Sequence, residues 1–313
     1  MGTLRLFLFG GVQVSYDGLP RQLRLPRTAQ LVLSYLLLQP RRPCPREVLA
    51  DLAWGERTEE SAHACLNTAL WRLRRILEPD GVPRGTYLHS ITPDEVGFNW
   101  ESDHWLDVTV FQGQAGRALS KDPGTLLPED VADLENVLTL YSGELLEGFY
   151  DDWALSERER LRIMYLNSLA FLMHYHRLHG DYQKALTHGS AILRVDPLRE
   201  EIHRDMMRLY LASGQRAQAL RQYETCRAII AEELGVPPME ETRRVHEQAL
   251  CDDTQSATDP VSFTTPATLQ QALERLHRAT GNFRAAEEEL QEAIRLVTGF
   301  SQQVALPDRT HRE

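Results

Sequence analysis

A short residue pattern occurs twice at an interval of 34 residues, and this repetition constrains the fold more than any other feature of the chain. The segments HGDYQKAL (179–186) and SGQRAQAL (213–220) each place a glycine five residues before an alanine. Glycine ends a helix readily because it adopts the left-handed backbone conformation, and a small alanine lets paired helices approach closely. The pattern therefore predicts successive helix pairs, and we expect the chain to be helical from about residue 104 onward.

An interval of 34 residues is the length of a tetratricopeptide repeat. A third copy of the pattern, TGNFRAAE (280–287), begins 67 residues after the second, which is close to two further intervals. A generic bundle of helical hairpins is the alternative interpretation. Residues 252–266 are polar, contain two prolines and lack periodicity, so we expect a linker there, followed by an additional helical hairpin at 267–300.

The first hundred residues show a different order of patterns. Short β-type alternations come first, then three helical periods, then two short strands around the turn TPDE. The strands are expected in TLRLFLFG (3–10), VQVSY (12–16), QLRL (22–25), TYLHSI (86–91) and VGFNW (96–100). The helices are expected at 28–39, 45–54 and 61–77, the first with Leu31, Tyr35 and Leu38 on its inner face. This is the order of a winged helix-turn-helix domain, in which the third helix enters the major groove of DNA.

The third helix combines a regular apolar row with arginines. Its inner row is expected to contain Ala62, Leu66, Ala69, Leu70, Leu73 and Leu77. Arginine donates two parallel hydrogen bonds to guanine or to phosphate oxygens, so an arginine-rich outer face suits a DNA duplex. An ordinary solvated helix face is the alternative. The outer residues expected to contact base edges are Asn67, Thr68 and Trp71 or Arg72, and those expected to contact the DNA backbone are Arg74 and Arg75.

Other basic side chains lie beside this helix in the expected fold. Arg46 is close to a helix start, whose free N–H groups favour anions, and Arg41 and Arg42 precede it in the loop. Arg84 and His89 lie at the base of the hairpin and are further phosphate candidates. The hairpin tip instead carries Asp94 and Glu95, whose carboxylates repel phosphate, so contact of the tip with DNA is doubtful.

The charge of the chain is uneven. Residues 1–102 carry 12 Arg and 11 Asp or Glu, which is 12 − 11 = +1, whereas the whole chain is −11. Residues 103–313 therefore carry −11 − 1 = −12. A near-neutral first third on an acidic remainder is consistent with one domain that faces an anion.

At this point the sequence resembles a known family. The first hundred residues look like the DNA-binding domain of OmpR/PhoB-type regulators, because the pattern LxxxLWRLRRIL occupies the place of the recognition helix. The segments DHWLDVTVFQ (103–112), YSGELLEGFYDDWALSERERLR (141–162) and EELGVPPMEETRRVHEQAL (232–250) are similar to the bacterial transcriptional activator domain. Together, over residues 1–251, they resemble the SARP-type regulators, the antibiotic regulatory proteins.

The resemblance implies a mainly α protein with a winged-helix domain at 1–102 and a tetratricopeptide-like domain at 103–251. It also implies a sequence-specific transcriptional activator that binds direct repeats in double-stranded promoter DNA as a homodimer and contacts RNA polymerase. The helical domain would serve dimerisation, polymerase contact or signal input. Two alternatives remain open: a protein-interaction scaffold of the tetratricopeptide type, and a regulator that senses a nucleotide or another small-molecule effector.

Several other classes of protein find no support in the sequence. FGGVQV and GVPRG are turn glycines and match no nucleotide-binding loop, and no set of residues meets the spacing of a catalytic site, so we expect no enzyme and no cofactor. His174, His176 and His179 have no HExxH or cysteine partner, so structural or surface roles are expected and no metal. The four cysteines are widely spaced, and no apolar run approaches the ~20 residues of a membrane span. We therefore expect a cytoplasmic protein with reduced thiols.

Overall fold

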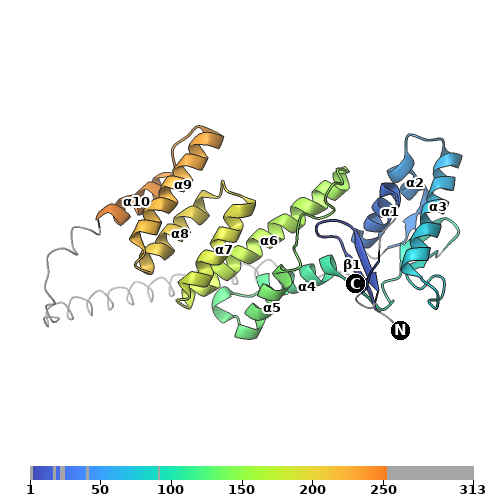
Figure 1. Ribbon diagram of the computed structural model, residues 1–313, viewed down its shortest axis with the longest axis horizontal. Coiled ribbons are helices and arrows are strands. Elements are labelled where there is room, and N and C mark those ends of the chain that lie inside the picture. Colours follow the sequence, from blue (N-terminus) through green and yellow to red (C-terminus); the bar gives the residue numbers. More distant parts are fainter. Residues whose placement is uncertain (1–2, 17–18, 22–24, 40–41, 91, 252–313) are drawn as a thin grey trace, which may run out of the picture. The chain divides into compact units, whose positions relative to one another are not determined.

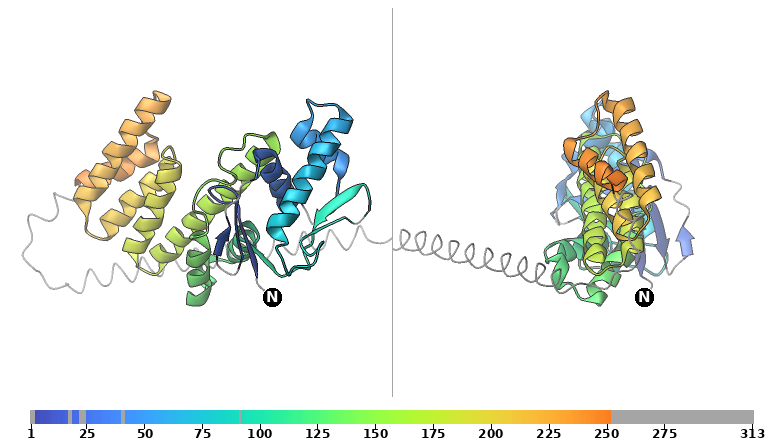
Figure 2. Two further views of the ribbon diagram at one scale, coloured as in Figure 1. Left: turned by 45° about the vertical axis from the view of Figure 1, so that its right-hand side comes forward. Right: turned by 90° about the vertical axis from the view of Figure 1, so that its left-hand side faces the viewer.

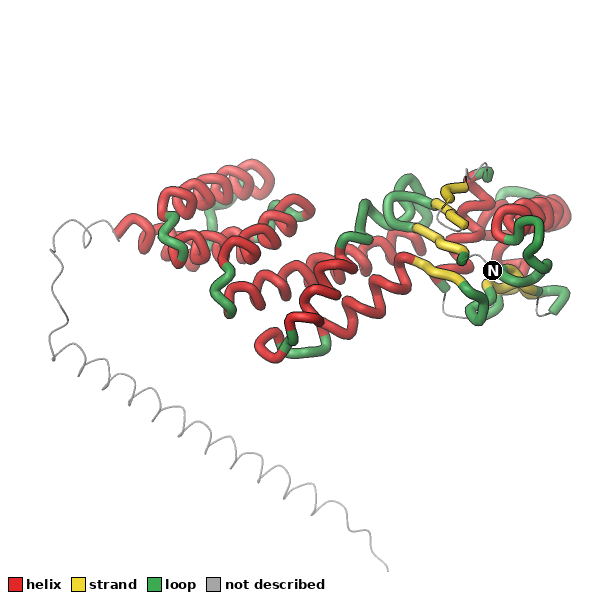
Figure 3. Tube along the Cα trace, turned by 60° about the horizontal axis from the view of Figure 1, so that its bottom comes forward, coloured by secondary structure: helices red, strands yellow, loops and turns green. Residues whose placement is uncertain are grey.

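The computed structural model describes residues 3–16, 19–21, 25–39, 42–90 and 92–251 (Figure 1). The expected linker at 252–266, the expected hairpin at 267–300 with its Gly281, and Arg41 lie outside these residues. Strands gather in the N-terminal part of the described chain, and the part that follows is helical (Figure 3). The prediction of a winged-helix domain followed by a helical repeat domain is confirmed.

A four-stranded sheet opens the chain, with the order β3-β2-β1-β7. β1 (Leu4–Phe7) and β2 (Gln13–Tyr16) form an antiparallel pair, and β3 (Leu19–Arg21) pairs with β2. The third strand therefore lies three residues before its expected position at 22–25, of which residues 22–24 are outside the described part. β7 (His104–Leu106) runs parallel to β1, so the expectation of helix from residue 104 onward is wrong for its first three residues.

Three helices and a second sheet complete the winged-helix domain. The helices are α1 (Arg27–Leu38), α2 (Arg46–Trp54) and α3 (Glu59–Leu77), each in contact with the other two. β5 (Leu88–His89) and β6 (Glu95–Phe98) form the expected hairpin, and the two-residue β4 (Cys44–Pro45) adds to it in the order β4-β6-β5. Sequence patterns did not indicate β4, because its partner β6 lies about fifty residues away along the chain.

The inner face of α1 differs from the expectation. Of the three residues assigned to it, only Leu31 is fully buried, whereas Tyr35 and Leu38 are partly exposed. Buried side chains instead surround most of the helix: Ala29, Leu31, Val32, Leu33, Ser34, Leu36 and Leu37. The helix is covered on several sides because it packs against α2, α3 and β6, so a single stripe does not describe it.

Seven α-helices and one 3-10 turn follow the first domain in the described part of the chain. They are α4 (Asp107–Leu119), the 3-10 turn η1 (Pro123–Thr125), α5 (Pro128–Leu138), α6 (Asp152–Leu178), α7 (Tyr182–Val195), α8 (Glu200–Ala212), α9 (Arg216–Leu234) and α10 (Glu240–Cys251). From α6 to α9 each helix contacts the next one, and Figure 2 shows them stacked in sequence order. None of the helices described is both long and apolar enough to cross a membrane.

The two repeated glycines act as the pattern predicts. Gly180 (φ 75°) separates α6 from α7, and Gly214 (φ 72°) separates α8 from α9, both in the left-handed region that favours glycine. The alanines five residues later, Ala185 and Ala219, are completely buried. The 34-residue interval therefore marks two helix pairs, α6–α7 and α8–α9.

Candidate nucleic-acid interface

Helix α3 is built as an amphipathic recognition helix. Its buried residues are the six predicted: Ala62, Leu66, Ala69, Leu70, Leu73 and Leu77. Glu59 and Glu60 lie in its first turn and Arg74 and Arg75 in its last, an arrangement that the helix dipole favours at both ends. The leucine row fixes the helix to the core, so the opposite face is displayed at the surface.

A groove runs between α3, the start of α2 and the hairpin. Six of the nine predicted DNA-binding residues line it: Arg46, Asn67, Trp71, Arg74, Arg84 and His89. Arg46 donates a hydrogen bond to the side-chain oxygen of Asn67, which ties the start of α2 to the middle of α3. Arg74 donates to the backbone oxygen of Leu88 (3.4 Å), which directs its guanidinium toward the hairpin.

The groove concentrates positive charge. The pKa of Arg74 is lowered, first by partial burial and then by the nearby guanidinium groups of Arg84 and Arg46, while Glu78 acts in the opposite direction. A cation that is disfavoured by burial and by neighbouring cations is stabilised by an anion placed among them. A phosphate group in this groove would therefore be stabilised by three guanidinium groups.

The remaining predicted residues lie outside this groove. Thr68 and Arg72 line a second depression of the surface, where α3 meets α1 and the end of α2. The hydroxyl of Thr68 donates to the backbone oxygen of Ala64 (3.0 Å). Arg75 lies over the ring of Trp71, 5.1 Å from its centroid, and the Trp71 side chain is 54% exposed. The Trp71 ring therefore lies at the surface, on the face of α3 opposite the leucine row, where it is accessible to a binding partner.

One residue that positions the interface was absent from the prediction. The carboxylate of Glu78, immediately after α3, accepts backbone hydrogen bonds from Gly85, Tyr87 and Leu88, each at 3.0 Å. These bonds fix the end of α3 to the first strand of the hairpin, and so set the distance between Arg74 and the groove wall opposite it. Sequence patterns offer no reason to choose Glu78, because its donors lie in a loop and at the start of β5, in a segment whose conformation the patterns do not define.

Comparisons with known proteins agree with this geometry. Residues 20–92 match the family "Transcriptional regulatory protein, C terminal", and residues 106–250 match the "Bacterial transcriptional activator domain". The regulatory protein AfsR of Streptomyces coelicolor is 28% identical over 254 residues, which cover 80% of this chain. The two family models lie one on each domain of this chain, and together with the likeness to AfsR they fit a SARP-type regulator.

The chain matches only part of the length of these relatives. It covers 25% of AfsR from Streptomyces coelicolor and 24% of AfsR from Streptomyces griseus, which is also 28% identical. The transcriptional regulatory protein EmbR of Mycobacterium tuberculosis is 22% identical over 251 residues, which are 78% of this chain and 62% of EmbR. The structure of Mycobacterium tuberculosis EmbR in complex with a low-affinity phosphopeptide has the same fold, with a TM-score of 0.66, 19% identity, and 84% of this chain and 67% of that chain covered.

The last strand of the first sheet, β7, leads directly into the first helix of the activator domain. β7 pairs with β1, and α4 of the activator domain begins at the next residue, Asp107. The buried carboxylate of Asp107 accepts backbone hydrogen bonds from Leu8 (2.8 Å), Phe9 (3.0 Å) and Val108 (2.7 Å). Burial raises the pKa of Asp107 to about 6, although the three N–H groups oppose this by stabilising the charged form.

The segment 141–162, which was quoted above for its likeness to the activator domain, also contacts the first sheet. The backbone N–H of Leu146 donates to the oxygen of Leu8 (2.9 Å). Arg158 of α6 holds this segment, because its guanidinium donates to the backbone oxygens of Leu145, Leu146 and Phe149 at 2.8, 2.7 and 2.8 Å. Leu146 has φ 49°, a conformation that is unfavourable for leucine and persists only where neighbouring contacts impose it.

Proposed function

We propose that this chain is a sequence-specific, DNA-binding transcriptional activator. The observation that carries the proposal is the groove beside α3, where Arg46, Arg74 and Arg84 gather next to the exposed ring of Trp71. The helix that forms one wall of this groove is held by a fully buried leucine row, so its outer face is rigid and available. A rigid, cationic helix face beside a hairpin is what a winged helix presents to a duplex.

The contacts divide by chemistry. α3 enters the major groove, where Trp71 and Arg72 reach base edges and Asn67 hydrogen-bonds a base. Because Arg46 occupies the oxygen of the Asn67 amide, Asn67 offers its N–H groups, which pair with acceptors such as guanine N7 or thymine O4. The groove between α3 and the hairpin receives the DNA backbone, and Arg74 and Arg84 neutralise its phosphates there.

The helical domain supplies the second half of the function. Two copies bind side by side on direct repeats, and the activator domain contacts RNA polymerase to raise transcription. This activity requires the protein to work in the cytoplasm, where bacterial DNA lies. Run-off transcription with purified polymerase, on a template that carries the selected site, tests this part, and a transcript level unaffected by the protein contradicts it.

Selection from random DNA tests the DNA-binding part, because it does not require the operator sequence in advance. Binding rounds on a random duplex pool recover the preferred sequence, and fluorescence anisotropy then compares that duplex with a scrambled one over a series of salt concentrations. We expect binding to the selected duplex to be at least about a thousandfold tighter. Equal affinity for both duplexes at every salt concentration contradicts sequence-specific binding.

Single substitutions test whether the groove binds the phosphates of DNA. Arg84→Ala and Arg74→Ala should each reduce the slope of log K against log salt concentration by about 0.9, because each removes one phosphate contact. The matched control is Arg117→Ala, since Arg117 is an exposed arginine on α4 of the other domain. If the control lowers the slope as much as the groove variants do, the charge effect is general and the groove has no special role. If the chain is instead a protein-interaction scaffold, none of these substitutions should change DNA binding.

A further inference from the structure

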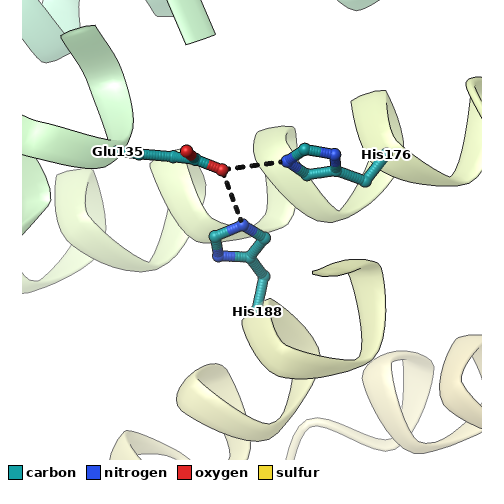
Figure 4. Close-up of side chains that lie close together, drawn as sticks. All are labelled: Glu135, His176 and His188. Atoms are coloured by element: carbon teal, nitrogen blue, oxygen red, sulfur yellow. Dashed lines mark hydrogen bonds and ion pairs between the residues drawn. The ribbon is translucent and has the colours of Figure 1, made fainter. Parts of the chain in front are cut away.

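Three side chains that can bind a metal converge where α5, α6 and α7 meet. They are Glu135 of α5, His176 of α6 and His188 of α7, and Figure 4 shows both imidazole rings directed at one carboxylate oxygen. The Oε1 atom of Glu135 lies 3.0 Å from Nε2 of His176 and 3.7 Å from Nε2 of His188. Sequence patterns did not indicate this cluster, because its members are 41 and 188 − 176 = 12 residues apart and belong to three helices.

The turn at Gly180 explains how the two histidines meet. It reverses the chain between α6 and α7, so that a residue near the end of α6 faces one in the middle of α7. The two rings stack with their centroids 5.4 Å apart and their planes 14° from parallel. His176 is 4% exposed, which agrees with the expected structural role and not with a surface role.

The distances suit a single tetrahedral cation. Zinc bonds of about 2.0–2.2 Å to nitrogen and oxygen place neighbouring ligand atoms about 3.3 Å apart. Two separations here are 3.0 and 3.7 Å, and all three ligand atoms lie within 4.8 Å of one another. Small rotations of the side chains would therefore bring all three atoms to bonding distance from one ion.

A hydrogen-bonded cluster without metal is the competing explanation, and it accounts for only one of the two histidines. His176 and Glu135 are within hydrogen-bond distance, but the 3.7 Å to His188 is too long for a hydrogen bond of normal geometry.

We propose that Glu135, His176 and His188 bind one divalent transition-metal ion of the zinc class, with a fourth position left for water or another ligand. Two imidazoles and one carboxylate are the ligand set of zinc sites that keep an open position. Imidazole nitrogen favours zinc, cobalt, nickel and copper over magnesium and calcium, which prefer oxygen ligands. The carboxylate of Asp181, 4.0 Å from Nδ1 of His176, lies on the side where an outer carboxylate orients a ligating histidine.

The ion would join three helices of the activator domain. α5 contacts α6, and α6 contacts α7, through apolar residues, and the metal adds bonds across all three. Binding to the folded form alone raises the melting temperature in proportion to the logarithm of free metal concentration. Stability is therefore a readout of metal binding that is independent of DNA binding.

Cobalt(II) is the probe, because tetrahedral Co²⁺ with nitrogen and oxygen ligands absorbs visible light. The full chain, free of any histidine tag and stripped with a chelator, is titrated with Co²⁺ and then with Zn²⁺. We expect saturation at one ion per chain, loss of the cobalt absorption when zinc displaces it, and a higher melting temperature with either ion. Absence of a saturable absorption change at one equivalent, together with an unchanged melting temperature, overturns the proposal.

Two variants separate the site from other histidines. His188→Gln should weaken Co²⁺ binding at least about tenfold, since loss of even an outer partner of a ligand costs that much. His174→Gln is the control, because His174 lies on the same helix as His176 but is exposed and pairs with Arg177. Circular dichroism of both variants in chelator checks that they fold, and Glu135→Gln gives a second test should His188→Gln unfold. Equal affinities in wild type, His188→Gln and Glu135→Gln would place the metal elsewhere.

Discussion

Glu78 holds the hairpin against the recognition helix, and substitution of this residue should loosen the hairpin. Its carboxylate accepts three backbone hydrogen bonds, from Gly85, Tyr87 and Leu88, each at 3.0 Å. Substitution by alanine removes both carboxylate oxygens and leaves these three backbone N–H groups without their acceptor. The strand that carries His89, and the loop that carries Arg84, are thereby released from α3.

The size of the effect follows from which donors can reach water. Gly85 is half-buried, so water can replace the carboxylate there, whereas Tyr87 and Leu88 are 2% and 0% exposed. A buried N–H without a partner costs about 1–3 kcal/mol, so Glu78→Ala should lower the local stability of the hairpin by about 2–6 kcal/mol. Glu78→Gln keeps one acceptor oxygen and loses the charge, and should cost about half as much, because charged hydrogen bonds are roughly twice as strong as neutral ones.

Amide hydrogen exchange measures this directly. A loss of about 2 kcal/mol corresponds to exchange that is about thirtyfold faster at the amides of Tyr87 and Leu88. Asp80→Ala is the control, because Asp80 is an exposed carboxylate two residues away and makes no side-chain hydrogen bond in the described part of the chain. If exchange at Tyr87 and Leu88 is the same in Glu78→Ala and in the control, Glu78 does not hold the hairpin and the reasoning fails.

Three more predictions concern stability. Asp107 binds its proton more tightly in the folded protein (pKa about 6) than at its ordinary 3.8. The unfolding free energy of wild type relative to Asp107→Asn should therefore fall by about 3 kcal/mol as pH rises from about 3 to about 7, in paired denaturant titrations. Arg158→Lys should lower stability by at least about 2 kcal/mol, because the single nitrogen of lysine cannot reach the three carbonyls that two guanidinium nitrogens reach. Limited proteolysis within residues 141–162 should increase. Gly113→Ala should stabilise α4 by about 0.5–1 kcal/mol, because the new methyl group meets open space. At Gly189 the methyl group would lie 2.9 Å from Met206, so Gly189→Ala should show no such gain. The melting temperatures of the two variants test this difference.

Much of the fold could be predicted because its determinants are local. The buried row of α3 follows from a period of 3.6 within nineteen residues, and Gly180 and Gly214 act within their own turns. What could not be predicted depends on partners far apart in the sequence. β7 exists because β1 lies beside it, about a hundred residues earlier, and the contact of His188 with Glu135 requires the packing of three helices. Helical or strand propensity within a short window contains neither piece of information.

The same contrast between local and long-range determinants applies to the candidate interface. The predicted residues of α3 are displayed by a helix that periodicity alone defines, so their exposure could be anticipated from the sequence. Their grouping could not: Arg46 and Arg84 join Arg74 in one groove only because the hairpin folds back on α3, and Glu78 fixes that position.

The contacts of β7, Asp107 and the segment 141–162 with β1 connect the two domains and hold the winged-helix domain in place. β1 is an inner strand only while β7 pairs with it, and β7 leads without interruption into α4. Asp107 binds the end of β1 from one side of this joint, and the segment fixed by Arg158 binds it from another. The four-stranded sheet is therefore completed by residues of the activator domain, and a boundary drawn at residue 102 divides a single hydrogen-bonded unit. Since both domains share that sheet, a rotation of the helical domain against the winged helix would have to break these backbone hydrogen bonds, so the presentation of α3 to DNA is coupled to the activator domain through the structure itself.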